Sequence, residues 1–120
     1  MIRIILPFPP SVNRLWRASK AGGVYKSSKY ADWSKHAKWA VKEQVRSKRL
    51  EGPFKLTILA VRPDKRRRDL DNLFKATLDC LQAAGVVADD CNAVWLEARW
   101  VDKGPECELI LEDMSDGKEV

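Results

Sequence analysis

The sequence predicts a single α/β (α+β) domain in which a mixed β-sheet packs with two main helices. Two stretches carry apolar residues at the three-to-four spacing of a helix, and four others are apolar or alternating, as strands are. Their order is strand, loop or hairpin, helix, strand, helix, strand, strand. With 120 residues the chain has the length of one domain, and we find no repeat or linker that divides it. We place the domain over residues 1–112 and a polar tail over 113–120.

The first half of the chain contains a strand and a long helix. Residues 1–6 are apolar and rich in isoleucine, and the prolines that follow end this strand. A short hairpin or loop is expected around Gly22 and Gly23. From Ser28 to about Lys48 the apolar spacing is helical, with Asp32 in the first turn, where the helix dipole favours an anion.

Three further segments have the pattern of strands. In residues 54–61 both alternating sets are largely apolar, which predicts a central strand covered on both faces. Residues 94–100 and 107–111 alternate more simply, and the Lys-Gly-Pro sequence at 103–105 supplies the turn between them. Together with the first strand, these segments can form one sheet.

The clearest helical stripe of the sequence runs from Leu70 to Ala84. Asp69 is well placed as its N-cap, and Gly85 is well placed as its C-terminal stop. The sequence therefore predicts a helix that starts directly after a carboxylate and ends at a glycine.

Composition excludes several classes of protein. No apolar run approaches the roughly 18 residues needed to span a bilayer, and the first ten residues lack the layout of a signal peptide. We therefore expect a cytoplasmic protein without a membrane partner. Cys80, Cys91 and Cys107 are an odd number of cysteines without paired spacing, so neither a disulfide framework nor a zinc site is indicated. We expect reduced thiols, at least two of them in the core.

Charge is distributed unevenly along the chain. Residues 1–75 hold 19 Lys and Arg against 6 Asp and Glu, whereas residues 76–120 hold 3 against 11. A basic half of this kind suits a polyanion such as nucleic acid. The alternative is a basic half that simply docks on the acidic half.

The first helix carries a row of cations at helical spacing, which are Lys35, Lys38, Lys42, Arg46 and Arg49. A solvated helix face explains this row at least as well as a track for phosphates does. Trp33 and Trp39 of the same helix fit packing better than base stacking. Trp16, which stands in a loop between two arginines, is the better stacking candidate.

The densest positive charge of the chain lies beside a pair of carboxylates. Arg66, Arg67 and Arg68 directly precede Asp69 and Asp71 at the start of the second helix. A helix N-terminus attracts anions, and the arginines add fixed positive charge there. Clustered carboxylates stay ionised together when a cation neutralises them, and Mg²⁺ prefers such oxygen ligands. The pattern suits phosphodiester hydrolysis, in which a metal activates water and cations stabilise the developing charge.

Two carboxylates are few ligands for a metal site, and the next acidic pair in the sequence is Asp89-Asp90. One of them could complete the site, although an ordinary polar turn explains the pair by itself. Lys75 follows Asp71 by four residues, so its simplest role is a helical ion pair. His36 has no evident partner and is not a candidate base, so a metal-bound water must supply the nucleophile. The residues thus indicate a metal-dependent phosphodiester site without specifying its substrate.

The segment KRRRDLDNLFKATLDCLQAAGVVADD resembles the signature of the RusA family of Holliday junction resolvases. The signature consists of a basic run, Asp-Leu-Asp-Asn-Leu, a lysine two residues on, an aspartate in the same helix, a glycine stop and an Asp-Asp pair. The opening LPFPPSVNRLWR and the segment SSKYADW are similar to the N-terminal part of that family. The resemblance covers nearly the whole chain and weakens after the Asp-Asp pair.

The resemblance implies roles for particular residues. It implies that Asp69, Asp71 and Asp90 form the catalytic metal-binding cluster and that Lys75 stabilises the transition state or the leaving group. It further implies DNA or phosphate contacts from basic and polar residues, namely Asn13, Arg14, Arg17, Arg66, Arg67 and Arg68.

The implied activity is Mg²⁺-dependent cleavage of four-way DNA junctions in recombination and repair, with Mn²⁺ as a possible substitute and no small-molecule cofactor. A homodimer is implied too, because two symmetric cuts need two related sites. Two other functions remain open from the residues alone. One is a non-catalytic DNA-binding module, and the other is a nuclease acting on other branched nucleic acids.

Overall fold

The computed structural model describes residues 1–10, 16–18, 24–26, 28–65 and 68–115. Its elements, in chain order, are β1 (Ile2–Leu6), β2 (Trp16–Ala18), β3 (Val24–Lys26), α1 (Ser28–Val45), β4 (Phe54–Ala60), α2 (Asn72–Ala83), the short 3₁₀ helix η2 (Asp90–Asn92), β5 (Ala93–Trp100) and β6 (Cys107–Asp113). The predicted α+β class with one mixed sheet and two main helices is confirmed.

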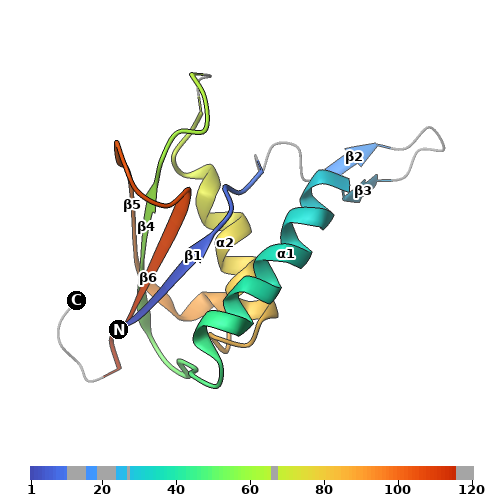
Figure 1. The fold of residues 1–120 in the computed structure, drawn as a ribbon. Coiled ribbons are helices and arrows are strands. Elements are labelled where there is room, and N and C mark those ends of the chain that lie inside the picture. The colour runs from blue at the N-terminus through green and yellow to red at the C-terminus, as the bar shows by residue number, and fades with distance from the viewer. Residues whose placement is uncertain (11–15, 19–23, 27, 66–67, 116–120) are drawn as a thin grey trace.

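The main sheet has the strand order β1-β6-β4-β5 (Figure 1). β4 pairs with β5 in parallel and with β6 antiparallel, and β1 pairs with β6 antiparallel. A parallel pair needs a crossover connection, which α2 provides between β4 and β5. The C-terminal end of β4 and the N-terminal end of β5 therefore lie at opposite ends of these neighbouring strands, and α2 connects the two ends.

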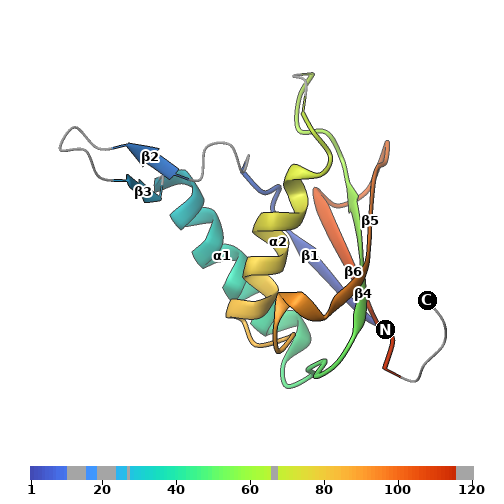
Figure 2. The same cartoon turned by 180° about the vertical axis from the view of Figure 1, so that it is seen from behind.

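Both main helices lie on the same face of the sheet (Figures 1 and 2). The buried core between helices and sheet includes Ile4, Leu56, Ile58, Leu81 and Leu109, each 0% exposed. β4 is an interior strand, as predicted, and none of its residues is exposed. Within the described residues the helices cover one of its faces, and on the other face Thr57 is buried while Lys55 and Leu59 are half-buried.

The uncovered face of the sheet combines apolar and charged side chains. Ile5 of β1 is 47% exposed there, and Lys55 of β4 pairs with Glu97 at 3.5 Å and lies 3.9 Å from the ring centre of Trp95. At the edge of the sheet, the side chain of Gln44 from α1 bonds both the N–H and the C=O of Ile5, at 2.7 and 2.8 Å. That pairing ties α1 to the edge strand β1.

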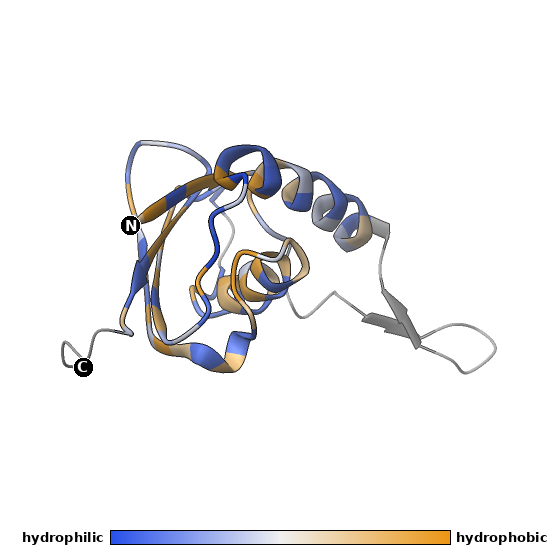
Figure 3. Ribbon diagram, turned by 90° about the horizontal axis from the view of Figure 1, so that it is seen from below, coloured by the Kyte–Doolittle hydropathy of each residue, from blue (hydrophilic) through white to orange (hydrophobic). Residues whose placement is uncertain are grey.

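Hydrophobic and hydrophilic residues alternate along the helix α1, as the banding of its ribbon in Figure 3 shows. The buried positions, Tyr30, Trp33, Ala37, Val41 and Val45, follow the predicted stripe. The helix ends at Val45, before the predicted Lys48, because Arg46 adopts a φ of 61° that breaks the helical backbone.

Two expectations for α1 were wrong. Its first turn contains no acidic residue, because the helix begins at Ser28 and Asp32 falls in the next turn. Trp39 does not pack in the core and is 69% exposed, whereas Trp33 is 8% exposed. Trp33 also donates its indole N–H to the carbonyl of Pro7 at 2.9 Å.

A small antiparallel hairpin precedes α1. β2 pairs with β3 in the register Arg17 to Tyr25, which confirms the hairpin alternative of the sequence prediction. Its tip at Gly22 and Gly23 lies outside the described residues. At the other end of the chain, β6 continues to Asp113, and the Met114 amide donates to the carbonyl of Pro53 at 2.9 Å.

All three cysteines lie within the described residues, and none forms a disulfide. Cys80 and Cys107 are buried, which confirms the expectation of at least two core thiols, and Cys91 is exposed. Burial raises the pKa of Cys80 and of Cys107 to about 12. Among the described residues no helix is long and apolar enough to cross a membrane.

Candidate active site

The two carboxylates of the Asp-Leu-Asp segment stand at the entry of α2. The prediction that Asp69 caps a helix beginning at Leu70 was wrong, because α2 begins at Asn72 and Asp71 occupies the N-cap position. The residues in between form a tight turn instead. The amides of Asn72 and Leu73 each donate to the carbonyl three residues earlier, on Asp69 and Leu70, at 3.2 Å.

Within the described residues, the carboxylates of Asp69 and Asp71 form no hydrogen bond or ion pair that supports the fold. Both residues are exposed, and the Asp71 side chain makes no capping hydrogen bond. A carboxylate at the N-cap position ordinarily accepts a bond from an amide of the first turn. Leaving it free keeps two anionic side chains and the positive end of the α2 dipole available to a ligand.

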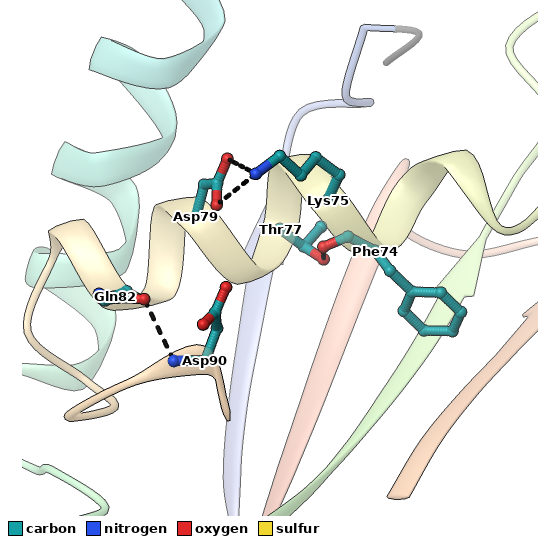
Figure 4. Close-up of polar contacts among 6 residues, drawn as sticks. All are labelled: Phe74, Lys75, Thr77, Asp79, Gln82 and Asp90. Atoms are coloured by element: carbon teal, nitrogen blue, oxygen red, sulfur yellow. Dashed lines mark hydrogen bonds and ion pairs between the residues drawn. The ribbon is translucent and has the colours of Figure 1, made fainter. Parts of the chain in front are cut away.

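Lys75 lies one turn into α2 and pairs with Asp79, with its ammonium 3.3 Å from a carboxylate oxygen (Figure 4). The expected helical ion pair of Lys75 therefore forms with Asp79, one turn after the lysine, and not with Asp71. Asp79 also contacts α1, because its charge and hydrogen bond add to the burial that raises the pKa of Tyr30. Asp79 therefore connects the lysine to the interface of the two helices.

The loop between β4 and α2 is held by stacked side chains. Arg68 pairs with Asp64 at 3.0 Å, and its guanidinium lies 5.4 Å from the ring centre of Phe8. Phe8 stacks in turn on Trp100 with 6.1 Å between ring centres, and Arg62 lies 4.5 Å from the Trp100 ring centre.

This stack joins the ends of β1, β4 and β5 just before Asp69. The sequence analysis missed it, because its members are distant in the chain and nothing local marks them as partners. It also shows that Arg68, the predicted phosphate contact, is already paired with a carboxylate.

Asp89 and Asp90 follow α2 in the chain and have different roles in the backbone. Asp89 caps η2, where its carboxylate accepts from the Cys91 amide at 2.9 Å, a bond that lowers the pKa of Asp89. The amide of Asp90 donates to the side chain of Gln82 at 3.1 Å, near the far end of α2. Figure 4 shows Asp90 on a separate segment beside Gln82, away from the start of the helix.

Asp90 does not join Asp69 and Asp71 within one chain. Gln82 is eleven residues after Asp71, which corresponds to about 16 Å along a helix at about 1.5 Å per residue. Ligand oxygens of one Mg²⁺ lie about 2.1 Å from the metal, so they are at most about 4 Å apart. Accordingly, the described residues contain no group of three or more His, Cys, Asp or Glu side chains placed to hold a metal ion.

Several predicted DNA contacts fall where no side chain is described. Asn13, Arg14, Arg66 and Arg67 lie outside the described residues. Arg17 lies in β2, of which the backbone alone is described. Their roles stay predictions.

Comparison with known proteins places this geometry in context. A family model described as Endodeoxyribonuclease RusA matches residues 7–112. A protein of Escherichia coli strain K12 named crossover junction endodeoxyribonuclease RusA is 36% identical over 113 residues, covering 92% of this chain and 93% of its own. A protein of the same name from Enterobacteria phage 82 has the same identity and coverage. One from Aquifex aeolicus is 34% identical over 107 residues, covering 88% of this chain and 82% of its own.

Proposed function

Because the chain belongs to the RusA family of endodeoxyribonucleases, we propose that it resolves four-way DNA junctions by paired symmetric phosphodiester hydrolysis in recombination and repair. The observation that carries this proposal is the start of α2, where Asp69 and Asp71 are exposed beside a basic loop and the Asp71 carboxylate makes no capping bond. A fold that needed these residues for stability would use their carboxylates as caps.

The residues of this chain would act through charge and position. The positive end of the α2 dipole and the basic loop would bind the scissile phosphate. Lys75, fixed by Asp79, would stabilise the negative charge that develops on the transition state or leaving group. Asn13, Arg14 and Arg17, together with Arg66 and Arg67, would hold the arms of the junction.

The exposed carboxylates fit a hard divalent cation in their chemistry, because Mg²⁺ takes oxygen ligands and retains water. Their number in one chain does not suffice for a three-carboxylate site. We propose Mg²⁺ as the cofactor, with Mn²⁺ as a substitute; when bound, the ion supplies an activated water and neutralises the carboxylates.

We further propose that a homodimer completes the site, with Asp90 of the partner subunit as the third carboxylate. The edge strand β5 supports this arrangement, since Val94, Trp95 and Leu96 are 46%, 43% and 43% exposed. A two-fold axis perpendicular to β5 would make α2 of the partner subunit run antiparallel to α2 of this chain. The open start of one α2 then comes to the same side as η2 of the other subunit. Two such composite sites, related by symmetry, would make the two cuts.

The remaining parts of the proposal concern the whole chain. The nuclease domain would comprise residues 1–112 and act on DNA in the cytoplasm, with no small-molecule cofactor. The polar tail from residue 113 onward would take no part in cleavage.

The test is cleavage of a synthetic four-way junction, alongside a duplex and a flap of the same sequence, with Mg²⁺, Mn²⁺ or EDTA. We expect paired nicks at symmetric positions of the junction and no product in EDTA. Asp71→Asn should abolish cleavage and retain binding, while the matched control Asp102→Asn, in the exposed turn after β5, should cut normally. Equal cutting of all three DNAs would indicate a nuclease for other branched substrates. A wild type that binds and cuts none would indicate a binding module.

A further inference from the structure

The exposed face of α1 carries a tryptophan among lysines. Trp39 is 69% exposed, and Lys35, Lys38 and Lys42 precede or follow it by four, one and three residues. Residues three or four apart are neighbours on a helix surface, so Lys35 and Lys42 lie next to Trp39, and Lys38 lies between Lys35 and Lys42. The four side chains line a hollow of about 260 Å³ on the surface. Trp39 thus lies at the centre of a patch, which we call the α1 patch, defined by Lys35, Lys38, Trp39 and Lys42.

The lysines of the α1 patch are exposed. Within the described part of the chain, no carboxylate forms an ion pair with Lys35, Lys38 or Lys42. Other basic side chains are paired, for example Arg3 with Glu108 and Lys75 with Asp79. Although the charge of Lys38 acts on the Cys80 thiol, a cationic cluster without ion pairs among the described residues attracts an anionic ligand.

An isolated exposed tryptophan is common on protein surfaces and needs no explanation. The combination is more specific. Surfaces that bind single-stranded nucleic acid join a positively charged track for the phosphates to aromatic rings on which bases stack. The bases of an intact duplex are already stacked inside the helix, so an exposed indole offers them nothing.

We infer that the α1 patch binds an unpaired segment of a DNA strand, with a base stacked on Trp39 and phosphates held by Lys35, Lys38 and Lys42. This inference rests on the proposed action on DNA and adds a second contact surface to it. α1 lies beside α2 on the same face of the sheet (Figures 1 and 2). A strand opened at the branch point could therefore reach the patch while the junction occupies the start of α2.

The test uses an oligothymidine single strand and a linear duplex of equal length, with affinities measured at several salt concentrations. Trp39→Leu removes the aromatic face and should weaken single-strand binding by about five- to a hundredfold, the range for loss of one stacked base. Trp39→Phe should restore most of that loss. Duplex affinity should be nearly the same for all three proteins.

Charge changes provide the matched control. Lys35→Ser or Lys42→Ser should lower the salt slope for the single strand by about 0.7 each, because each removes one phosphate contact. Lys103→Ser, in the exposed turn between β5 and β6, removes the same charge elsewhere and should leave the slope unchanged. A single strand containing 5-bromodeoxyuridine should cross-link to the peptide that contains Trp39.

Two results would overturn the inference. One is a Trp39→Leu protein that binds the single strand as the wild type does. The other is a change in sedimentation of Trp39→Leu, which would make the α1 patch a contact between protein chains. Neither result depends on cleavage, so failure of the proposed resolvase activity is seen separately, in a wild type that cuts no junction.

Discussion

The two ends of α2 are built in opposite ways. At the C-terminal end, the amides of Ala84, Gly85 and Val86 donate to the last turn at 2.9 to 3.1 Å. Gly85 adopts a φ of 82°, and Val86 is buried at 2% exposure. At the N-terminal end, Asp71 occupies the cap position and makes no capping bond.

The difference shows that the C-terminal end of α2 contributes to stability, whereas the side chain at its N-cap remains available to a ligand. A helix whose C-terminal end is bonded and packed can do without a side-chain cap at its N-terminal end and still fold. We call the C-terminal end of α2 the closed end and the N-terminal end the open end. Substitutions at the closed end should reduce stability when they strain the backbone and should leave cleavage unchanged. Substitutions of the aspartates at the open end should leave stability unchanged and reduce cleavage.

The largest effect is expected at the open end. Asp69→Asn and Asp71→Asn should each reduce single-turnover junction cleavage by at least about a thousandfold, within the range for removal of a central electrostatic group. Since neither carboxylate supports the fold, the free energy of unfolding should change by less than about 0.5 kcal/mol. Urea denaturation checks the second value. A loss of stability above about 1 kcal/mol would mean that the carboxylates serve as caps after all.

The closed end should show the reverse behaviour. Gly85→Ala should cost about 1 to 2 kcal/mol of stability, because the left-handed backbone disfavours any Cβ. An added Cβ would meet no atom within 4 Å, so the cost is backbone strain alone. Cleavage at a temperature where the variant stays folded should match the wild type. An unchanged melting temperature would show that the stop of α2 is not held by this glycine.

The smallest effect at neutral pH concerns the two buried thiols, Cys80 of α2 and Cys107 of β6. Cys80 and Cys107 have a pKa of about 12 in the folded chain against 9.0 ordinarily. Above pH 9 the unfolded chain therefore loses these protons first, and stability should fall as the pH rises from about 9 toward 12. Cys80→Ala with Cys107→Ala should flatten this part of the profile. A thiol reagent at neutral pH should modify Cys91 alone until the protein unfolds.

Local sequence patterns predicted the positions of the helices and strands better than they predicted which side chains are buried or act as caps. The spacing of apolar residues located both helices, and Gly85 marked the end of α2 correctly. Its start was misplaced by two residues because Asp69 and Asp71 are both good caps and their sequence cannot choose between them. Trp39 was misjudged although a signal existed, because it falls among the lysines and off the apolar stripe of α1.

The parts of the site that depend on tertiary structure were beyond local reasoning. Phe8 and Trp100 are 92 positions apart in the sequence, and only the sheet brings them together. The separation of Asp90 from Asp71 follows from the parallel pairing of β4 and β5. In that pairing, the start of β5 and the start of α2 lie at opposite ends of the parallel strands. The number of residues between Asp71 and Asp90 does not reveal this separation.

Subunit mixing tests the composite site most directly. Asp71→Asn and Asp90→Asn should each be inactive alone as homodimers. In a heterodimer of the two, one composite site carries both changes and the other has both native aspartates. We therefore predict that the isolated heterodimer, purified with two different tags, nicks one strand of a four-way junction. A heterodimer that makes no cut, while a heterodimer of wild type and Asp71→Asn does, would show that Asp90 does not act across the subunits.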